Sequence, residues 1–163
     1  MPHKKILDLA MVYYCILGEI EDGNATALIY NSNIKNWHIK EDELYRTAVS
    51  NTPKLLPVKI YEMSELIKYF DTAEGRYSLD DPWCSNLYVL TNKSRINGAA
   101  GIMYEGVLKK LADKLESDMY ILPSSIHEVI ILPKSTMFNK EELMAMVRDV
   151  NTEGVSKDEV LSY

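Results

Sequence analysis

The sequence has few of the residues from which metal centres and disulfide frameworks are built. It contains two cysteines, Cys15 and Cys84, and three histidines among 163 residues. No two histidines have the spacing of a metal-ligand pair, and the spacing of the cysteines suggests no disulfide framework. We therefore expect no metal, no cofactor and reduced thiols, as in a cytoplasmic protein.

Long apolar runs are also missing. A membrane-spanning helix needs about 20 apolar residues in succession. The most apolar stretch, residues 6–17, is shorter and is interrupted by Asp8. Gly18 and Glu19 follow it without the small-residue cleavage site of a signal peptide. We expect no membrane partner, and the stretch is better explained as a buried strand.

Neither glycine nor positive charge is abundant enough for the common nucleotide and nucleic-acid sites. The seven glycines form neither Gly-x-x-x-x-Gly-Lys nor Gly-x-Gly-x-x-Gly. The net charge is -6, and the pI is about 5.1. This balance argues against direct binding of nucleic acid, because such binding depends on neutralising phosphates.

What is present is a globular composition with 47% hydrophobic residues. The hydrophobic spacing predicts a single α+β domain over residues 1–163, with a long loop at about residues 71–86. Turn signals between short apolar runs favour hairpins, and hence a largely antiparallel sheet with helices packed on it. The expected strands are residues 6–17, 26–30, 87–90, 99–104, 119–122 and 129–132. The expected helices are residues 41–52, ended by Pro53, then 62–70, 104–115, one that begins at Asn139, and a short one near residues 156–159.

One cluster contains the parts of an acyl-transfer site. Ser124, Ser125, His127 and Glu128 supply two hydroxyls, an imidazole and a carboxylate within five residues. A hydrolase that uses His127 with Ser124 or Ser125 is therefore one hypothesis. The chain has no Gly-x-Ser-x-Gly elbow. The plainer interpretation is a hairpin turn whose hydroxyls satisfy backbone groups.

Other residues indicate a binding surface. The connector at residues 91–98 is polar and basic through Asn92, Lys93 and Arg95. Trp83, beside the more accessible thiol Cys84, and Glu128 are further candidates for contact with a partner. Eleven tyrosines suit a protein interface. Acidic residues gather in residues 62–81 and 141–159, where they could compete with nucleic acid for a basic protein.

Four stretches together carry a family resemblance. They are residues 7–14 (LDLAMVYY), 43–57 (which ends in NTPKLLP), 87–100 (which begins LYVLTNK and ends in GAA) and 120–130 (YILPSSIHEVI). With them the chain resembles a family of uncharacterised bacterial proteins, frequent in gut anaerobes and their mobile elements. Members are often longer upstream, so the chain resembles their carboxy-terminal portion or a short form of the family. The resemblance implies no activity and no catalytic residues.

The leading expectation is a non-enzymatic protein-binding module whose partner the sequence does not name. The mobile-element context that the resemblance implies favours a narrower alternative. This is an acidic inhibitor of a host defence nuclease, similar in manner to an anti-CRISPR protein and bound to a basic nucleic-acid-binding protein. The hydrolase with His127 is the remaining alternative.

Overall fold

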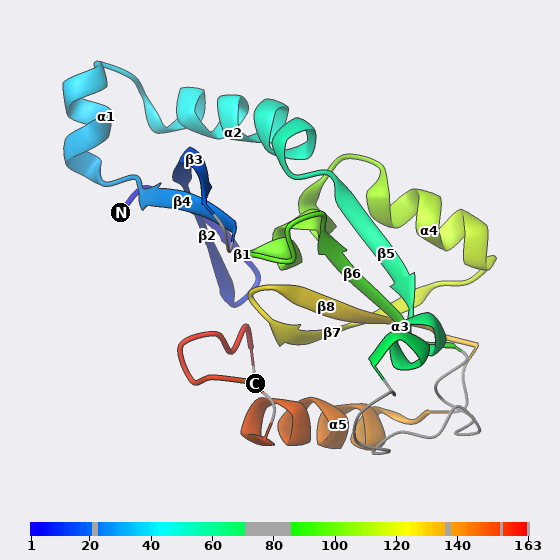
Figure 1. Cartoon of the computed structure of the whole chain (residues 1–163). Coiled ribbons are helices and arrows are strands. Elements are labelled where there is room, and N and C mark those ends of the chain that lie inside the picture. The colour runs from blue at the N-terminus through cyan, green and yellow to red at the C-terminus, as the bar shows by residue number, and fades with distance from the viewer. Residues whose placement is uncertain (21–22, 71–85, 136–137, 154, 163) are drawn as a thin grey trace. The chain divides into compact units, whose positions relative to one another are not determined.

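The computed structural model describes residues 1–20, 23–70, 86–135, 138–153 and 155–162 (Figure 1). The chain divides into two compact units, residues 1–57 and residues 58–163. Residues 71–85 of the predicted long loop, with Trp83 and Cys84, lie outside the described residues. The expectation of one domain over the whole chain stays a prediction.

The first unit contains two antiparallel hairpins and two helices. Strand β1 (His3–Ile6) pairs with β2 (Leu9–Val12), and β3 (Tyr14–Ile20) pairs with β4 (Gly23–Leu28). The helices are α1 (Asn31–Trp37) and α2 (Glu41–Leu55). The single strand predicted for residues 6–17 is wrong, because Leu7 takes a left-handed conformation (φ 54) and turns the chain between β1 and β2.

The core of this unit forms where one face of the β3–β4 hairpin meets the helices. Tyr13, Ile29 and Leu44 are buried together, and residues of α1 and α2 pack against them. Helix α2 begins with three acidic residues, which suit the positive end of its dipole. It continues through Pro53 to Leu55, so the predicted end at Pro53 is wrong. Pro53 has no N–H to donate to the Val49 carbonyl. The helix still continues past it, and the N–H of Leu56 donates to the Thr52 carbonyl at 2.8 Å.

Tyr13 supplies a stability prediction for this core. Its buried hydroxyl has no hydrogen-bond partner among the described residues. Burial raises the pKa of the Tyr13 phenol above its ordinary value of 10.0, and Glu41 raises it further. Removing an unsatisfied hydroxyl relieves a desolvation penalty, so Tyr13→Phe should raise the free energy of unfolding by about 1 kcal/mol.

The same substitution should change the alkaline limb of the stability curve. Because folding raises the pKa of the phenol, the unfolded chain ionises first, so the stability is independent of this group below its ordinary value of 10.0 and falls as the pH rises from there toward the folded-state value. Tyr13→Phe should therefore flatten the fall in stability above about pH 10. Urea unfolding of both proteins at neutral and alkaline pH measures the two effects. A variant less stable than the wild type at neutral pH would contradict the prediction.

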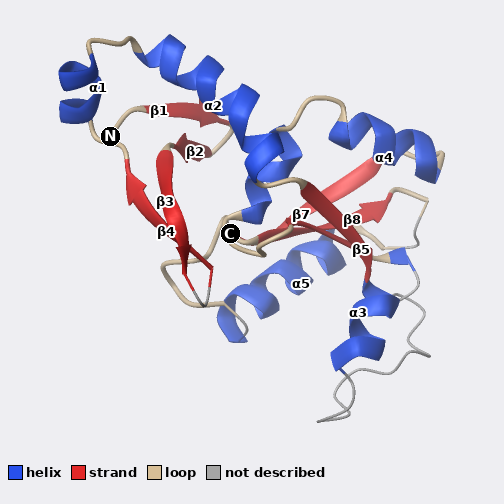
Figure 2. Ribbon diagram, turned by 45° about the horizontal axis from the view of Figure 1, so that its top comes forward, coloured by secondary structure: helices blue, strands red, loops and turns tan. Residues whose placement is uncertain are grey.

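The second unit is built on a four-stranded antiparallel sheet with strand order β5-β6-β8-β7. Helices α4 and α5 lie on opposite sides of this sheet (Figure 2). The structure is therefore an α+β fold with antiparallel sheets, as the sequence predicts. The strands and helices are β5 (Val58–Glu62), α3 (Met63–Phe70), β6 (Tyr88–Asn92), the 3-10 helix η2 (Gly98–Met103), α4 (Val107–Leu115), β7 (Met119–Ser125), β8 (Glu128–Pro133) and α5 (Lys140–Glu153).

Two apolar clusters hold this unit together, one on each face of the sheet. The first combines Leu90, Val129 and Ile131 of the central strands with Leu111 of α4. The second combines Leu122 and Leu132 with Leu143 of α5. Because alternate residues of a strand point to opposite faces, both faces of β6 and β8 are buried.

Several local predictions fail for identifiable reasons. The strand predicted at residues 99–104 is the 3-10 helix η2, which follows Asn97 in a left-handed conformation (φ 53). Strand β7 does not end at Leu122 but passes through Pro123, which an edge strand tolerates. The helix predicted near residues 156–159 is a turn.

The predicted start of the last helix is confirmed. The N–H of Asn139 donates to the Glu142 carboxylate at 2.8 Å, and the Asn139 side-chain oxygen accepts from the N–H of Glu142 at 2.9 Å. This reciprocal pair is a capping box.

Candidate functional site

The turn between β7 and β8 is where the sequence places its catalytic candidates. Ile126 and His127 form this turn, whereas Ser124 and Ser125 belong to β7. Ser124 is the extra residue of a bulge, since Pro123 pairs with Val129 and Ser125 pairs with Glu128. The predicted Ser124–Ser125 turn is therefore shifted by two residues.

Both ring nitrogens of His127 are engaged. The backbone N–H of Asn97 donates to Nδ1 at 3.1 Å, and Nε2 lies 3.3 Å from a carboxylate oxygen of Glu159. A nitrogen that accepts a hydrogen bond carries no proton, so the proton of the neutral ring is on Nε2 and faces Glu159. The ring thus joins three segments that are distant in sequence.

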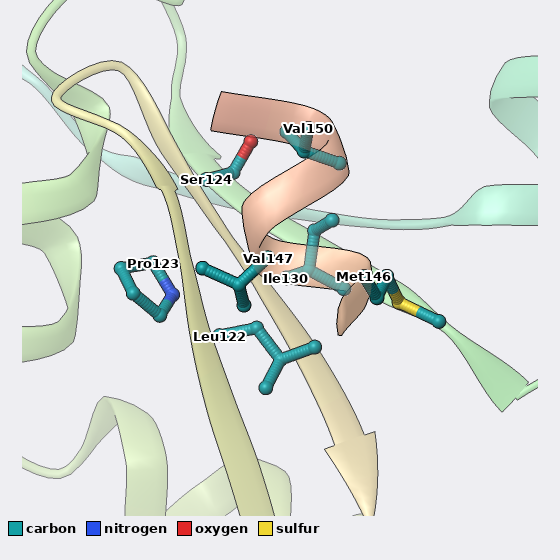
Figure 3. A pocket seen from close by; sticks show the side chains of 7 residues that line it. All are labelled: Leu122, Pro123, Ser124, Ile130, Met146, Val147 and Val150. Carbon is teal, nitrogen blue, oxygen red and sulfur yellow. The ribbon is translucent and has the colours of Figure 1, made fainter. Parts of the chain in front are cut away.

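Neither candidate serine is bonded to that ring among the described residues. The Ser125 hydroxyl accepts the backbone N–H of His127 at 3.0 Å. Ser124 lines a narrow apolar seam between β7, β8 and α5 (Figure 3), which has no room for a water molecule. The geometry shows His127 and Ser125 holding the turn.

A serine-directed probe tests the hydrolase hypothesis. Because both ring nitrogens are occupied and both serines are buried, we expect a fluorophosphonate to label neither Ser124 nor Ser125 in the folded chain. Mass spectrometry of the treated protein measures this. Labelling that disappears in His127→Ala, with the chain still folded, would overturn the expectation.

The connector between β6 and η2 folds against the same turn. Thr91 donates its hydroxyl to the His127 carbonyl at 2.8 Å. Asn92 is almost fully buried (1% exposed) and donates its side-chain amide to the Ile96 carbonyl at 2.7 Å. Its amide oxygen accepts the Ser94 hydroxyl at 2.8 Å. Asn92 is thus a residue that shapes the connector.

The remaining predicted binding residues do not converge on one feature. Lys93 and Arg95 are exposed on the connector, and the Arg95 guanidinium lies 5.6 Å from the centre of the Tyr61 ring. Glu128 is half-buried at the start of β8. Trp83 lies outside the described residues.

Sequence reasoning missed an open groove of about 400 Å³ within the second unit. Its apolar lining comes from β5, β6 and α4, and its charged lining from β5, α3 and α4. Two sequence signals point to parts of this groove. They are the apolar alternation of β5 and the i, i+4 spacing of Lys110 and Lys114, which places both lysines on one face of α4. The lining residues are Val58, Ile60, Glu62, Glu65, Tyr88, Val107, Lys110, Leu111 and Lys114.

The groove combines a half-buried phenol with four charged side chains. Burial raises the pKa of the Tyr88 phenol above its ordinary value of 10.0, and the Glu62 carboxylate adds to this. In the described part of the chain, ion pairs join Lys109 to Asp113 and Lys134 to Asp118, while the charged groups of the groove form none.

The first unit has a different surface, rich in exposed apolar side chains. Of the thirteen large apolar side chains found exposed among the described residues, nine lie within residues 1–57. Leu17 is 68% exposed and Leu28 is 46% exposed on the β3–β4 hairpin. Tyr14 pairs with Leu28, and both lie on the face opposite to the buried Tyr13 and Ile29. The hairpin is therefore apolar on both faces.

Within the ranges that the structure covers, no group of three or more His, Cys, Asp or Glu side chains could hold a metal ion. No helix among these residues is long and apolar enough to cross a membrane.

The fold and these surfaces define an α+β protein with a structured polar turn, an open groove and an apolar hairpin. The chain belongs to the family of unknown function DUF5688, whose model matches residues 1–163. This confirms the resemblance to an uncharacterised family. Neither the curated proteins nor the solved structures give a match.

Proposed function

We propose that the chain is a protein-binding module and that the β3–β4 hairpin of its first unit contacts the partner. The observation that supports this is the exposed apolar surface of that hairpin. Leu28, which pairs with Tyr14, is exposed on the outer face, and Leu17 is exposed at the irregularity between Ile16 and Gly18. A sheet with two apolar faces normally has both of them covered. Exposed apolar side chains gathered on one element favour an interaction site.

The charge distribution separates this proposal from the acidic-inhibitor hypothesis. Residues 1–57 hold six Lys or Arg and seven Asp or Glu, so the first unit is nearly neutral. The second unit holds twelve basic and seventeen acidic residues. Contact through the hairpin should depend weakly on salt, whereas an acidic inhibitor should release a basic partner at high salt.

Affinity capture with hairpin variants tests the proposal. The tagged wild type should retain a specific protein in washes from about 0.1 M to about 1 M salt. The double variant Leu17→Ser, Leu28→Ser should lose that protein, because two exposed apolar contacts are removed. Met144→Ser, an exposed position of α5 (45%), is the matched control and should retain it. Equal retention by the hairpin variant would contradict the proposal, and loss of the partner by salt alone would favour the acidic inhibitor.

A further inference from the structure

We propose that the groove of the second unit binds a small zwitterion: an apolar side chain on a backbone with a free ammonium and a free carboxylate group. Free apolar amino acids and short peptides of such residues share this chemistry. The inference is independent of the proposed partner contact, since the groove lies within residues 58–163 and the hairpin within residues 1–57.

The floor of the groove is apolar and suits the apolar side chain of the ligand. Val58 and Ile60 alternate on β5 and face the α4 side of the sheet, where they pack with the buried Leu111. They remain half-buried, so they still offer surface to a ligand. Burial of one aliphatic side chain against such a floor favours binding, because it removes apolar surface from water.

The walls of the groove supply charged groups of both signs, which suit the ammonium and carboxylate groups of the ligand. Lys110 and Lys114 belong to the lining that α4 contributes, and Glu62 and Glu65 belong to the lining that β5 and α3 contribute. The described structure gives none of these four an ion-pair partner, although Lys109 on the same helix pairs with Asp113 at 3.2 Å. A purely anionic ligand would be repelled by the glutamates, and a purely cationic one by the lysines. A zwitterion can satisfy both walls.

The size of the ligand follows from the volume. At about 400 Å³, the groove is near the lower end of the range typical of small-molecule sites. This suits an amino acid or a short peptide rather than a folded partner. Tyr88 adds a phenol beside Glu62, which can accept or donate one further hydrogen bond.

Calorimetric titration of the full chain with L-leucine and with Leu-Leu tests the inference. We expect at least one of them to bind with a dissociation constant of about 1 mM or tighter. The tighter of the two shows whether the groove takes a free amino acid or a short peptide, because the two probes differ in the distance between their charged groups. N-acetyl-leucine N-methylamide, which lacks both charges, should bind at least about fivefold more weakly.

Paired variants locate the site. The double variants Lys110→Met, Lys114→Met and Glu62→Gln, Glu65→Gln should each weaken the tighter probe about fivefold or more. Lys109→Met is the matched control, since Lys109 neighbours Lys110 but does not line the groove, and it should bind as the wild type does. Leucine amide, which retains only the ammonium group, should be sensitive to the glutamate pair and not to the lysine pair.

Three results would overturn the inference. They are no heat of binding for either probe up to about 10 mM, equal affinity for the capped compound, and equal loss in Lys109→Met and the lysine pair. Circular dichroism of each variant confirms that it is folded. None of these results depends on whether the hairpin of the first unit binds a protein, so the two proposals fail separately.

Discussion

Gly98→Ala should lower the free energy of unfolding by about 3 kcal/mol, because the added methyl group has no space. A Cβ at this position would lie 2.2 Å from the Thr91 hydroxyl, 2.5 Å from the His127 carbonyl and 2.7 Å from the Asn92 backbone nitrogen. Two of these atoms are backbone, so relief requires the β6 connector and the β7–β8 turn to separate. Urea unfolding measures the loss, and amide spectra should show changes at Asn97 and His127.

Gly18→Ala is the control for a glycine in open space. No atom lies within 4 Å of a Cβ at that position. We expect a change of less than about 0.5 kcal/mol. Equal effects at the two glycines would mean that the close contact around Gly98 does not exist in solution.

Leu90→Ala should lower the free energy of unfolding by a similar amount, because it leaves a cavity in the core. Leu90 has no exposed surface and lies at the centre of the cluster formed by β6, β8 and α4. Truncation removes buried methyl groups and leaves a cavity, which typically costs about 2–5 kcal/mol. The close-packed neighbours Ile131 and Leu111 belong to different elements, so we expect the cavity to collapse little and the loss to be about 3–4 kcal/mol.

An exposed position of the same unit serves as the comparison. Met144→Ala on α5 removes a side chain that is 45% exposed and introduces a good helix former. Its stability should change by less than about 0.5 kcal/mol. A loss at Leu90 no larger than that at Met144 would contradict the position of Leu90 in the core.

The sequence predicts those parts of the fold whose causes are local. The capping box of α5 needs only Asn139 and Glu142, three residues apart, and the apolar stripe of α4 needs only its own spacing. The antiparallel α+β class follows from turn signals between short strands. These features depend on residues that are neighbours in the chain.

The failures have non-local causes. Residues 99–104 have the small side chains expected of a closely packed segment, and the packing is confirmed, since a Cβ on Gly101 would lie 2.9 Å from Leu90. The segment is nevertheless a 3-10 helix, because the backbone at Asn97 reverses direction to reach His127. Likewise, the left-handed conformation of Leu7 divides residues 6–17, whose apolar side chains predict a single strand.

The candidate site shows the same limit. The sequence predicts a catalytic cluster at residues 124–128 because serine, histidine and carboxylate residues are adjacent there. In the structure the His127 ring instead contacts Glu159, which is 32 residues away. The walls of the groove come from segments whose proximity depends on the β5–β6 pairing and on the packing of α4. The i, i+4 spacing of Lys110 and Lys114 places both on one face of α4, but it does not show that β5 and α3 contribute to the same groove.

Site-specific photo-crosslinking from the hairpin tests the protein-binding proposal most directly. A benzophenone amino acid would replace Leu28 in one variant and Met144 in another, in cells that produce the protein. We expect one discrete protein adduct from position 28 that persists in about 1 M salt, and none from position 144. Adducts from position 144 alone, or no adduct from position 28, would contradict it.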